Sequence, residues 1–261
     1  MKKMLISSLV ALLSAALPVH AAETEFPSAA AIAKLSDAER MKLAEKTEVW
    51  QPVPAVVSSA AGQVPSDAIQ LLDSTLSQWQ AVNGKAVSWQ MDDGVMTVMP
   101  GGGDIKTKAD FCDIQLHLEW RAPLPAAGKT GQLRNNSGIF LQEKYEIQIL
   151  DSYQNATYPN GQAGAVYKQT PPLVNAMRPA GEWQSYDIIY QAPRFDGNKL
   201  TQPGHVTLLH NGVLVQNHSQ ILGTTEWIGP PKQQPHGCAP LKLQDHGDQV
   251  SFRNIWLRRL N

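Results

Sequence analysis

One stretch of the sequence, residues 132–152, carries polar side chains within two runs that otherwise have β-strand composition, SGIFLQ and YEIQILD. Because side chains alternate along a strand, Glu146 and Gln148 share one face of the second run. A carboxylate beside an amide on a half-apolar floor suits acid–base chemistry on a sugar. The same pattern also fits an ordinary sheet face turned to solvent.

The two runs are predicted to form a hairpin, because only Glu143-Lys144 lies between them. A two-residue loop would pair Gln142 with Tyr145. On that register the core face holds Phe140, Tyr145, Ile147 and Ile149, and the opposite face holds Ile139, Leu141, Glu146 and Gln148. A loop one residue longer would change the cross-strand partners but would leave the carboxylate and the amide on the same side of their own strand.

Two further runs alternate in the same way. DIQLHLEWR has an apolar side and a side with His117, Glu119 and Arg121, and LKLQDHG has Lys242, Gln244 and His246 opposite its leucines. These polar faces could line the same groove, and titratable groups that converge in a cleft indicate acid–base chemistry. A solvated sheet surface is the competing interpretation for His117, Glu119 and Lys242, whereas the Asp-His-Gly context at a strand end favours a functional His246.

Several other chemistries are not indicated. The sequence has no GxSxG, HExxH or P-loop motif, and its one glycine-rich run, GGGD at 101–104, precedes a strand. Gln148 stands where a retaining glycosidase would carry its second acid, and Asp151 lies on the opposite parity, so direct oxocarbenium hydrolysis is disfavoured. A net charge of −1 gives no basic surface for a nucleic acid.

The chain from Ile69 onwards reads as all-β, because short alternating runs are separated by Gly, Pro, Asn and Asp. Asp93-Gly94 and Asn211-Gly212 have the residues that a type I′ hairpin turn requires. With 43% hydrophobic residues, the chain can bury one full core, and regular short strands predict a single β-sandwich or barrel.

The N-terminal part differs in composition. Residues 1–21 have a basic start, an apolar run too short to span a membrane and small residues at Val19 and Ala21, which predicts a signal peptide cleaved after Ala21. We therefore expect a periplasmic or secreted protein with no membrane segment after cleavage. Residues 22–64 are predicted to be an extension that packs on the sandwich without carrying chemistry. It would have a helix over residues 37–46, capped by Ser36 and Glu39, and a proline-containing linker.

Several long motifs resemble one bacterial family in the same order: NNSGIFLQ, YEIQILDSY, GQAGAVYKQTPPLVNA, GEWQSYDIIYQAPRFD and LQDHG followed by FRNIW. Residues 65–261 are thereby similar to the 3-keto-disaccharide hydrolase domain, also described as 3-keto-α-glucoside-1,2-lyase/3-keto-2-hydroxy-glucal hydratase. The resemblance implies a concanavalin-like jelly-roll β-sandwich that cleaves 3-keto-glycosides made by a separate glycoside 3-dehydrogenase.

A ketone at C3 acidifies the hydrogen at C2, so the glycosidic bond can leave by elimination and water can then add back. This path needs a base, an acid and a group that polarises the 3-oxygen. We expect Glu146 and His246 to be the base and the acid, in an order that the sequence leaves open. Arg134, Asn136 and Gln148 are expected donors to the sugar, and Glu119, Asp151 and Gln244 are expected further contacts.

Two alternatives stay open. The sequence indicates no cofactor with certainty, but a divalent cation could bind if the strands that carry His117, Glu119, Glu146 and His246 were neighbours. The chain could also be a non-catalytic, lectin-like carbohydrate-binding module, because lectins share this sandwich.

Residues 161–176, GQAGAVYKQTPPLVNA, are predicted to be a loop, because two Gly, a Pro pair and an Asn interrupt them. The loop directly follows YEIQILDSY, so it could overhang the floor and bring Tyr167 and Lys168 to the substrate. An ordinary surface loop is the alternative.

Cys112 and Cys238 are the two cysteines of the chain, and each lies just before a predicted strand. In an oxidising compartment they are expected to form a disulfide. The geometric objection is that antiparallel neighbours begin at opposite ends of a sheet. The two strands would have to be parallel, with one strand between them, or a loop would have to carry Cys238 across. Two buried free thiols are the alternative.

Overall fold

The structure is a computed structural model that describes residues 26–58, 60, 63–125 and 128–260. The predicted signal peptide lies outside these residues. The chain divides into two compact units, with the boundary between Val56 and Val57.

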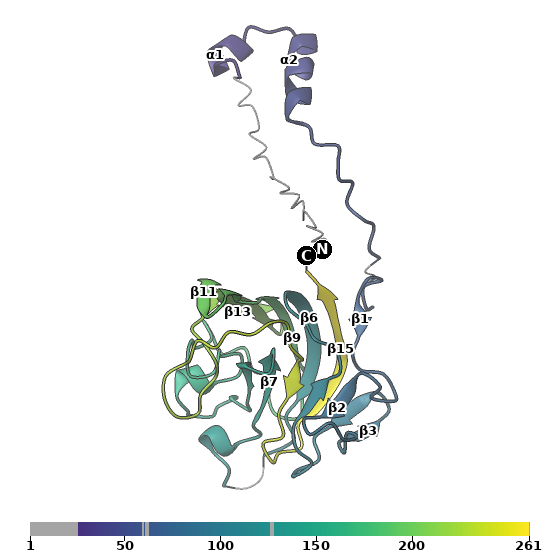
Figure 1. Ribbon diagram of the computed structural model, residues 1–261, viewed down its shortest axis with the longest axis vertical. Helices are drawn as coiled ribbons and strands as arrows, with labels where there is room; N and C mark the ends of the chain where they lie inside the picture. Colours follow the sequence, from purple (N-terminus) through teal and green to yellow (C-terminus); the bar gives the residue numbers. More distant parts are fainter. Residues whose placement is uncertain (1–25, 59, 61–62, 126–127, 261) are drawn as a thin grey trace, which may run out of the picture. The chain divides into compact units, whose positions relative to one another are not determined.

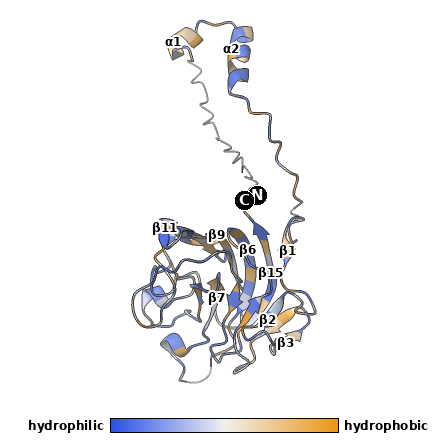
Figure 2. Ribbon diagram, viewed as in Figure 1, coloured by the Kyte–Doolittle hydropathy of each residue, from blue (hydrophilic) through white to orange (hydrophobic). Residues whose placement is uncertain are grey.

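The N-terminal unit contains two short α-helices, α1 (Ala29–Ile32) and α2 (Asp37–Ala44), followed by a 3-10 turn, η1 (Glu45–Thr47). The capping box predicted for Ser36 and Glu39 is confirmed. The helix is two residues shorter than predicted because its last turn tightens into η1. Figure 2 shows both hydrophilic and hydrophobic residues on α2, and neither helix buries a residue. In the described ranges, no helix is long and apolar enough to cross a membrane.

The second unit is an antiparallel β-sandwich, as predicted (Figure 1). Its larger sheet runs in the order β13-β12-β9-β6-β15-β4-β3, and β1 also pairs with β15. These strands are β1 (Ile69–Gln70), β3 (Gln90–Asp92), β4 (Val95–Thr97), β6 (Ile114–Arg121), β9 (Gln184–Gln191), β12 (Gly204–His210), β13 (Val213–Ile221) and β15 (Ser251–Arg259). Asp93-Gly94 and Asn211-Gly212 form the predicted hairpin turns, with positive φ at all four residues.

The smaller sheet runs in the order β2-β5-β14-β7-β8. Its strands are β2 (Trp79–Ala81), β5 (Ile105–Thr107), β14 (Lys242–Leu243), β7 (Ser137–Leu141) and β8 (Tyr145–Ile149), and a separate hairpin joins β10 (Arg194–Asp196) to β11 (Lys199–Gln202). Apolar residues from both sheets pack into one core that includes Trp120, Tyr186, Ile147 and Phe252. In β7 and β8 the residues that face away from this core are buried too.

The predicted register of the β7–β8 hairpin is wrong. Leu141 pairs with Tyr145, so the loop has three residues, 142–144. Its first two residues have positive φ, and the Gln142 side chain is buried, where it accepts a hydrogen bond from the Tyr190 hydroxyl at 2.6 Å. As a result Phe140 lies on the face of Glu146, whereas Ile139 and Leu141 turn to the core.

The predicted disulfide between Cys112 and Cys238 is present, with 4.7 Å between the Cα atoms. An antiparallel bridge joins Phe111 to Ala239, the residues directly before Cys112 and after Cys238. The cysteines therefore stand opposite each other ahead of the regular strands. The loop that leads into β14 carries Cys238 across, which answers the geometric objection.

Candidate active site

The outer face of β7 and β8 forms the floor of a pocket of about 190 Å³. Directly paired residues share a face, so Gly138 lies opposite Gln148 and Phe140 lies opposite Glu146. Strands β7 and β8, the end of β14 and two loops supply the walls. The lining residues are Asn136, Phe140, Glu146, Gln148, Tyr167, Thr225, Trp227, Gln244 and His246.

Glu146 is the acidic residue among those that line this pocket. Its side chain is only 4% exposed, and burial raises the pKa of its carboxyl to about 8, with the nearby Asp104 raising it further and Lys242 opposing. The carboxyl extends over Gly138, where a Cβ would lie 2.6 Å from Oε1. Within the part of the chain that the structure describes, no hydrogen bond holds this carboxyl. Glu146 thus keeps its proton at neutral pH and is free to give it to a ligand.

The backbone of Glu146 is held on both sides. Its N–H donates to Thr225 Oγ1 at 2.9 Å, and its carbonyl accepts from the N–H of Tyr167 at 3.0 Å. Val166 forms a β-bridge with Ile147, so part of the predicted 161–176 loop lies along the edge of β8. This pairing brings Tyr167 to the pocket wall. Burial raises the pKa of the Tyr167 phenol, which keeps the hydroxyl protonated as a donor.

Two amide oxygens in the pocket are buried and lack hydrogen-bond partners among the described residues, Gln148 Oε1 and Gln244 Oε1. The orientation of Gln148 is fixed because its Nε2 donates to Gln132 Oε1 at 2.9 Å. Buried polar atoms are normally paired. These two oxygens are therefore suited to accept hydrogen bonds from the hydroxyl groups of a bound sugar.

His246 is exposed at the pocket rim. The preceding Asp245 fixes the turn: its two carboxylate oxygens accept from the N–H groups of Gly103 at 2.9 Å and Gly247 at 3.0 Å. An imidazole has two ring nitrogens that can accept or donate a proton in a reaction. The pocket therefore presents a buried protonated carboxyl and an accessible imidazole.

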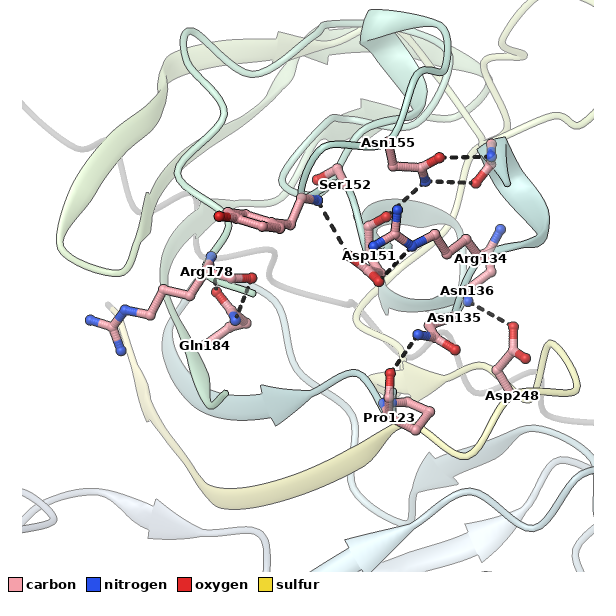
Figure 3. Close-up of polar contacts among 12 residues, drawn as sticks. Pro123, Arg134, Asn135, Asn136, Asp151, Ser152, Asn155, Arg178, Gln184 and Asp248 are labelled. Atoms are coloured by element: carbon pink, nitrogen blue, oxygen red, sulfur yellow. Dashed lines mark hydrogen bonds and ion pairs between the residues drawn. The ribbon is translucent and has the colours of Figure 1, made fainter. Parts of the chain in front are cut away.

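A framework of buried polar contacts supports the wall that carries Asn136 (Figure 3). The Asn136 N–H donates to Asp248 Oδ2 at 3.0 Å, and Lys129 pairs with the other oxygen of Asp248. Arg134 Nε donates to Asp151 Oδ2 at 2.8 Å. Burial raises the pKa of Asp151, and Arg134 opposes this shift. Arg134 and Asp151 therefore bind each other and do not line the pocket.

The structure brings together part of the predicted residue set. The pocket is lined by Glu146, His246, Asn136, Gln148, Tyr167 and Gln244. Arg134, Asp151 and Lys168 are not among the residues that line it. The Lys168 ammonium instead donates to the carbonyl of Trp227 at 2.5 Å, so it holds the neighbouring loop.

The expectation that Glu119 shares this groove is wrong, as it is for His117. Both lie on β6 in the larger sheet, where the apolar residues face the core and the polar ones face outward. There Glu119 pairs with Arg253, and His117 Nδ1 contacts Asp187 at 2.6 Å. The strand neighbourhood that a cation site would need is therefore missing. No three His, Cys, Asp or Glu side chains in the described ranges are placed to hold a metal ion.

Three lining residues were missed from the sequence: Phe140, Thr225 and Trp227. The predicted two-residue loop places Phe140 in the core, whereas the observed three-residue loop places it on the face of Glu146. Thr225 and Trp227 lie in TTEWIGPP, outside any expected strand. An aromatic residue in a loop with Gly and Pro was the available signal.

Comparisons with known proteins agree with this fold. Residues 67–258 match the family described as the 3-keto-alpha-glucoside-1,2-lyase-like domain. A crystal structure from Parabacteroides distasonis, described as a candidate glycosyl hydrolase, is 50% identical, covers 83% of this chain and 96% of its own, and has a TM-score of 0.80. A second such protein from that organism is 21% identical, with 75% and 94% covered and a TM-score of 0.56, and shows the fold alone. No curated protein matches the chain. The matches support a carbohydrate-processing activity.

Proposed function

Because the chain belongs to the 3-keto-alpha-glucoside-1,2-lyase-like domain family, we propose that it cleaves the glycosidic bond of 3-keto-glycosides by elimination followed by hydration. The observation that carries the proposal is the single buried carboxyl among the residues that line the pocket. A retaining glycosidase needs two carboxyl groups about 5 Å apart. One protonated carboxyl and one imidazole are instead the acid and the base that an elimination requires.

In the first step the imidazole of His246 removes the proton from C2, and the electron pair forms an enolate through the 3-oxygen. The Tyr167 hydroxyl and the Asn136 amide are the available donors to that oxygen. The enolate then re-forms the ketone and makes the C1–C2 double bond as the bond from C1 to the glycosidic oxygen breaks. Glu146 gives its proton to this oxygen, and the alcohol leaves.

In the second step water adds across the double bond. The Glu146 carboxylate takes a proton from the water as its oxygen bonds to C1, and the His246 imidazolium returns a proton to C2. Both groups regain their starting states, and the net reaction is hydrolysis. Gln148 and Gln244 accept hydrogen bonds from the sugar hydroxyls with their free oxygens.

The source of the substrate and the compartment of the reaction follow from this chemistry and from the N-terminal sequence. The 3-keto substrate must come from an oxidoreductase that converts the 3-hydroxyl of a glycoside to a ketone. The signal sequence in residues 1–21 would place the reaction in the periplasm or outside the cell.

The test is to incubate the protein with a 3-keto-disaccharide in D₂O and to follow the released monosaccharides. Elimination and hydration would leave solvent deuterium at C2 of the 3-keto product, whereas direct hydrolysis would leave hydrogen there. Free 3-keto-glucose in the same buffer controls for spontaneous exchange, and the unoxidised disaccharide should not react. Glu146→Gln should lower kcat by about 10²–10⁴. Tight binding without any release would support a lectin-like module instead.

A further inference from the structure

A second compartment, of about 340 Å³, adjoins the pocket described above. We call the two the outer and the inner compartment. They share Asn136, Tyr167, Trp227 and His246, so both open onto the same catalytic groups. The outer compartment adds three residues, Gln132, Leu133 and Tyr158.

The outer compartment presents large apolar side chains that the fold itself leaves uncovered. Trp227 is 74% exposed and Leu133 is 68% exposed. Lys168 donates to the Trp227 carbonyl and so holds the backbone there, and the Tyr158 hydroxyl is hydrogen-bonded to the Tyr167 hydroxyl at 2.8 Å. Exposed apolar surface that lines a cleft indicates a ligand with an apolar face.

Gln132, the amide that only the outer compartment adds, is fully bonded within the protein. The Gln132 amide donates to Thr157 Oγ1 at 2.9 Å and to the Gly161 carbonyl at 2.8 Å, and its oxygen accepts from Gln148. The Asn136 amide donates to the Gln132 carbonyl at 2.8 Å. The inner compartment differs, since it keeps two buried amide oxygens without partners. Its chemistry suits hydroxyl groups, whereas the outer chemistry suits a ring without them.

We propose that the outer compartment binds the leaving group and selects an aromatic ring, so that the preferred substrates are 3-keto-glycosides of aromatic alcohols and phenols. In this proposal Trp227 supplies the stacking surface and Leu133 adds a second apolar side chain to the lining. This assignment rests on the proposed function for its chemical step, but the selection of the ring is a property of binding alone. A second sugar would bring hydroxyl groups to a wall where the Gln132 amide is already bonded.

The kinetic test compares the 3-keto forms of benzyl glucoside, methyl glucoside and a glucose disaccharide of the same anomeric configuration. Benzyl and methyl alcohols are leaving groups of similar reactivity, so a difference between them reports binding of the ring. We expect kcat/KM for the benzyl compound to exceed that for methyl by about tenfold or more, with the disaccharide close to methyl. Trp227→Ala should lower kcat/KM for the benzyl compound much more than for the methyl compound, so that most of this preference is lost. Trp50→Ala is the matched control, because Trp50 is equally exposed but lies in the N-terminal unit.

A disaccharide preferred over the benzyl compound, or an unchanged preference in Trp227→Ala, would overturn the proposal. Binding of the unoxidised benzyl and methyl glucosides, measured by saturation-transfer NMR, separates this outcome from failure of the proposed function. If no 3-keto-glycoside is cleaved, tighter binding of benzyl glucoside that requires Trp227 still supports the aromatic site. Equal binding of the two glucosides refutes it.

Discussion

At the scale of single residues, the carboxyl of Glu146 has an unusual environment. It lies in the pocket floor, largely shielded from solvent, and Lys242 is the nearby positive charge. The Lys242 ammonium is itself bound to Asp104 at 2.8 Å. The lysine also sits over the Phe140 ring, 3.8 Å from its centre. The pair Lys242–Asp104 is therefore nearly neutral as seen from the pocket. Burial then dominates the balance and keeps Glu146 protonated.

The raised pKa of Glu146 makes stability depend on pH. The ordinary pKa is 4.5 and the folded value is about 8, so between these values the folded protein holds a proton that the unfolded chain has lost. The contribution of this proton to the free energy of unfolding is therefore fully present below pH 4.5 and is lost as the pH rises to about 8. We expect the titration of Glu146 alone to lower the free energy of unfolding by about 4 kcal/mol between pH 5 and pH 9.

Urea unfolding of wild type and Glu146→Gln at pH 5 and pH 9 measures this effect. The variant should lose less stability than wild type over that range, because glutamine does not titrate. Glu182→Gln, which replaces an exposed carboxyl, is the control and should follow wild type. Parallel losses in wild type and Glu146→Gln would show that the carboxyl is not held protonated by burial.

At the scale of elements, the β7–β8 hairpin works as one unit because its register decides which side chains share the floor. Gly138 lies diagonally across from Glu146, and the absence of a side chain there gives the carboxyl its place. A Cβ on Gly138 would lie 2.6 Å from Glu146 Oε1 and 3.1 Å from both Glu146 Cγ and the Phe140 ring. The glycine is thus required by the neighbouring side chain.

Gly138→Ala should therefore displace the Glu146 carboxyl while the hairpin stays folded. We expect kcat for 3-keto-glycoside cleavage to fall by about 10²-fold, because a shift of about 1 Å in a reacting group has an effect of that size. The melting temperature should change by only a few degrees. Gly237→Ala is the control, since its added Cβ meets no atom within 4 Å. Full activity in Gly138→Ala would mean that the Glu146 position is not needed for turnover.

At the scale of the whole molecule, the disulfide joins two positions 126 residues apart in the sequence. Closing a loop of this length removes conformations from the unfolded chain, and the chain-entropy account gives about 4–5 kcal/mol. The double variant Cys112→Ala, Cys238→Ala should unfold at a lower urea concentration by an amount that corresponds to this value or less. Thiol titration of the denatured, non-reduced wild type should find no free thiol, and two free thiols would contradict the bond.

Much of the sandwich was predictable, because alternation and the Asp-Gly and Asn-Gly turns are local signals. The register of β7–β8 was not, because it depends on Gln142 reaching Tyr190 and the Phe111 carbonyl, contacts that are distant in sequence. Polar alternation also could not tell that β6 and β8 belong to different sheets. Strands β2 and β5 have three residues each, too few to show a period.

The position of β15 also bears on the order of folding. Strand β15 follows every other strand of the larger sheet in the sequence, yet it lies between β6 and β4 and also pairs with β1. A growing chain that has not yet reached Ser251 cannot join these three strands to one another. The larger sheet can therefore be completed only after synthesis of the whole domain. Until then, the strands made earlier have edges without a pairing partner. Such late, long-range pairing makes folding slow. The incompletely folded chain then needs protection from aggregation.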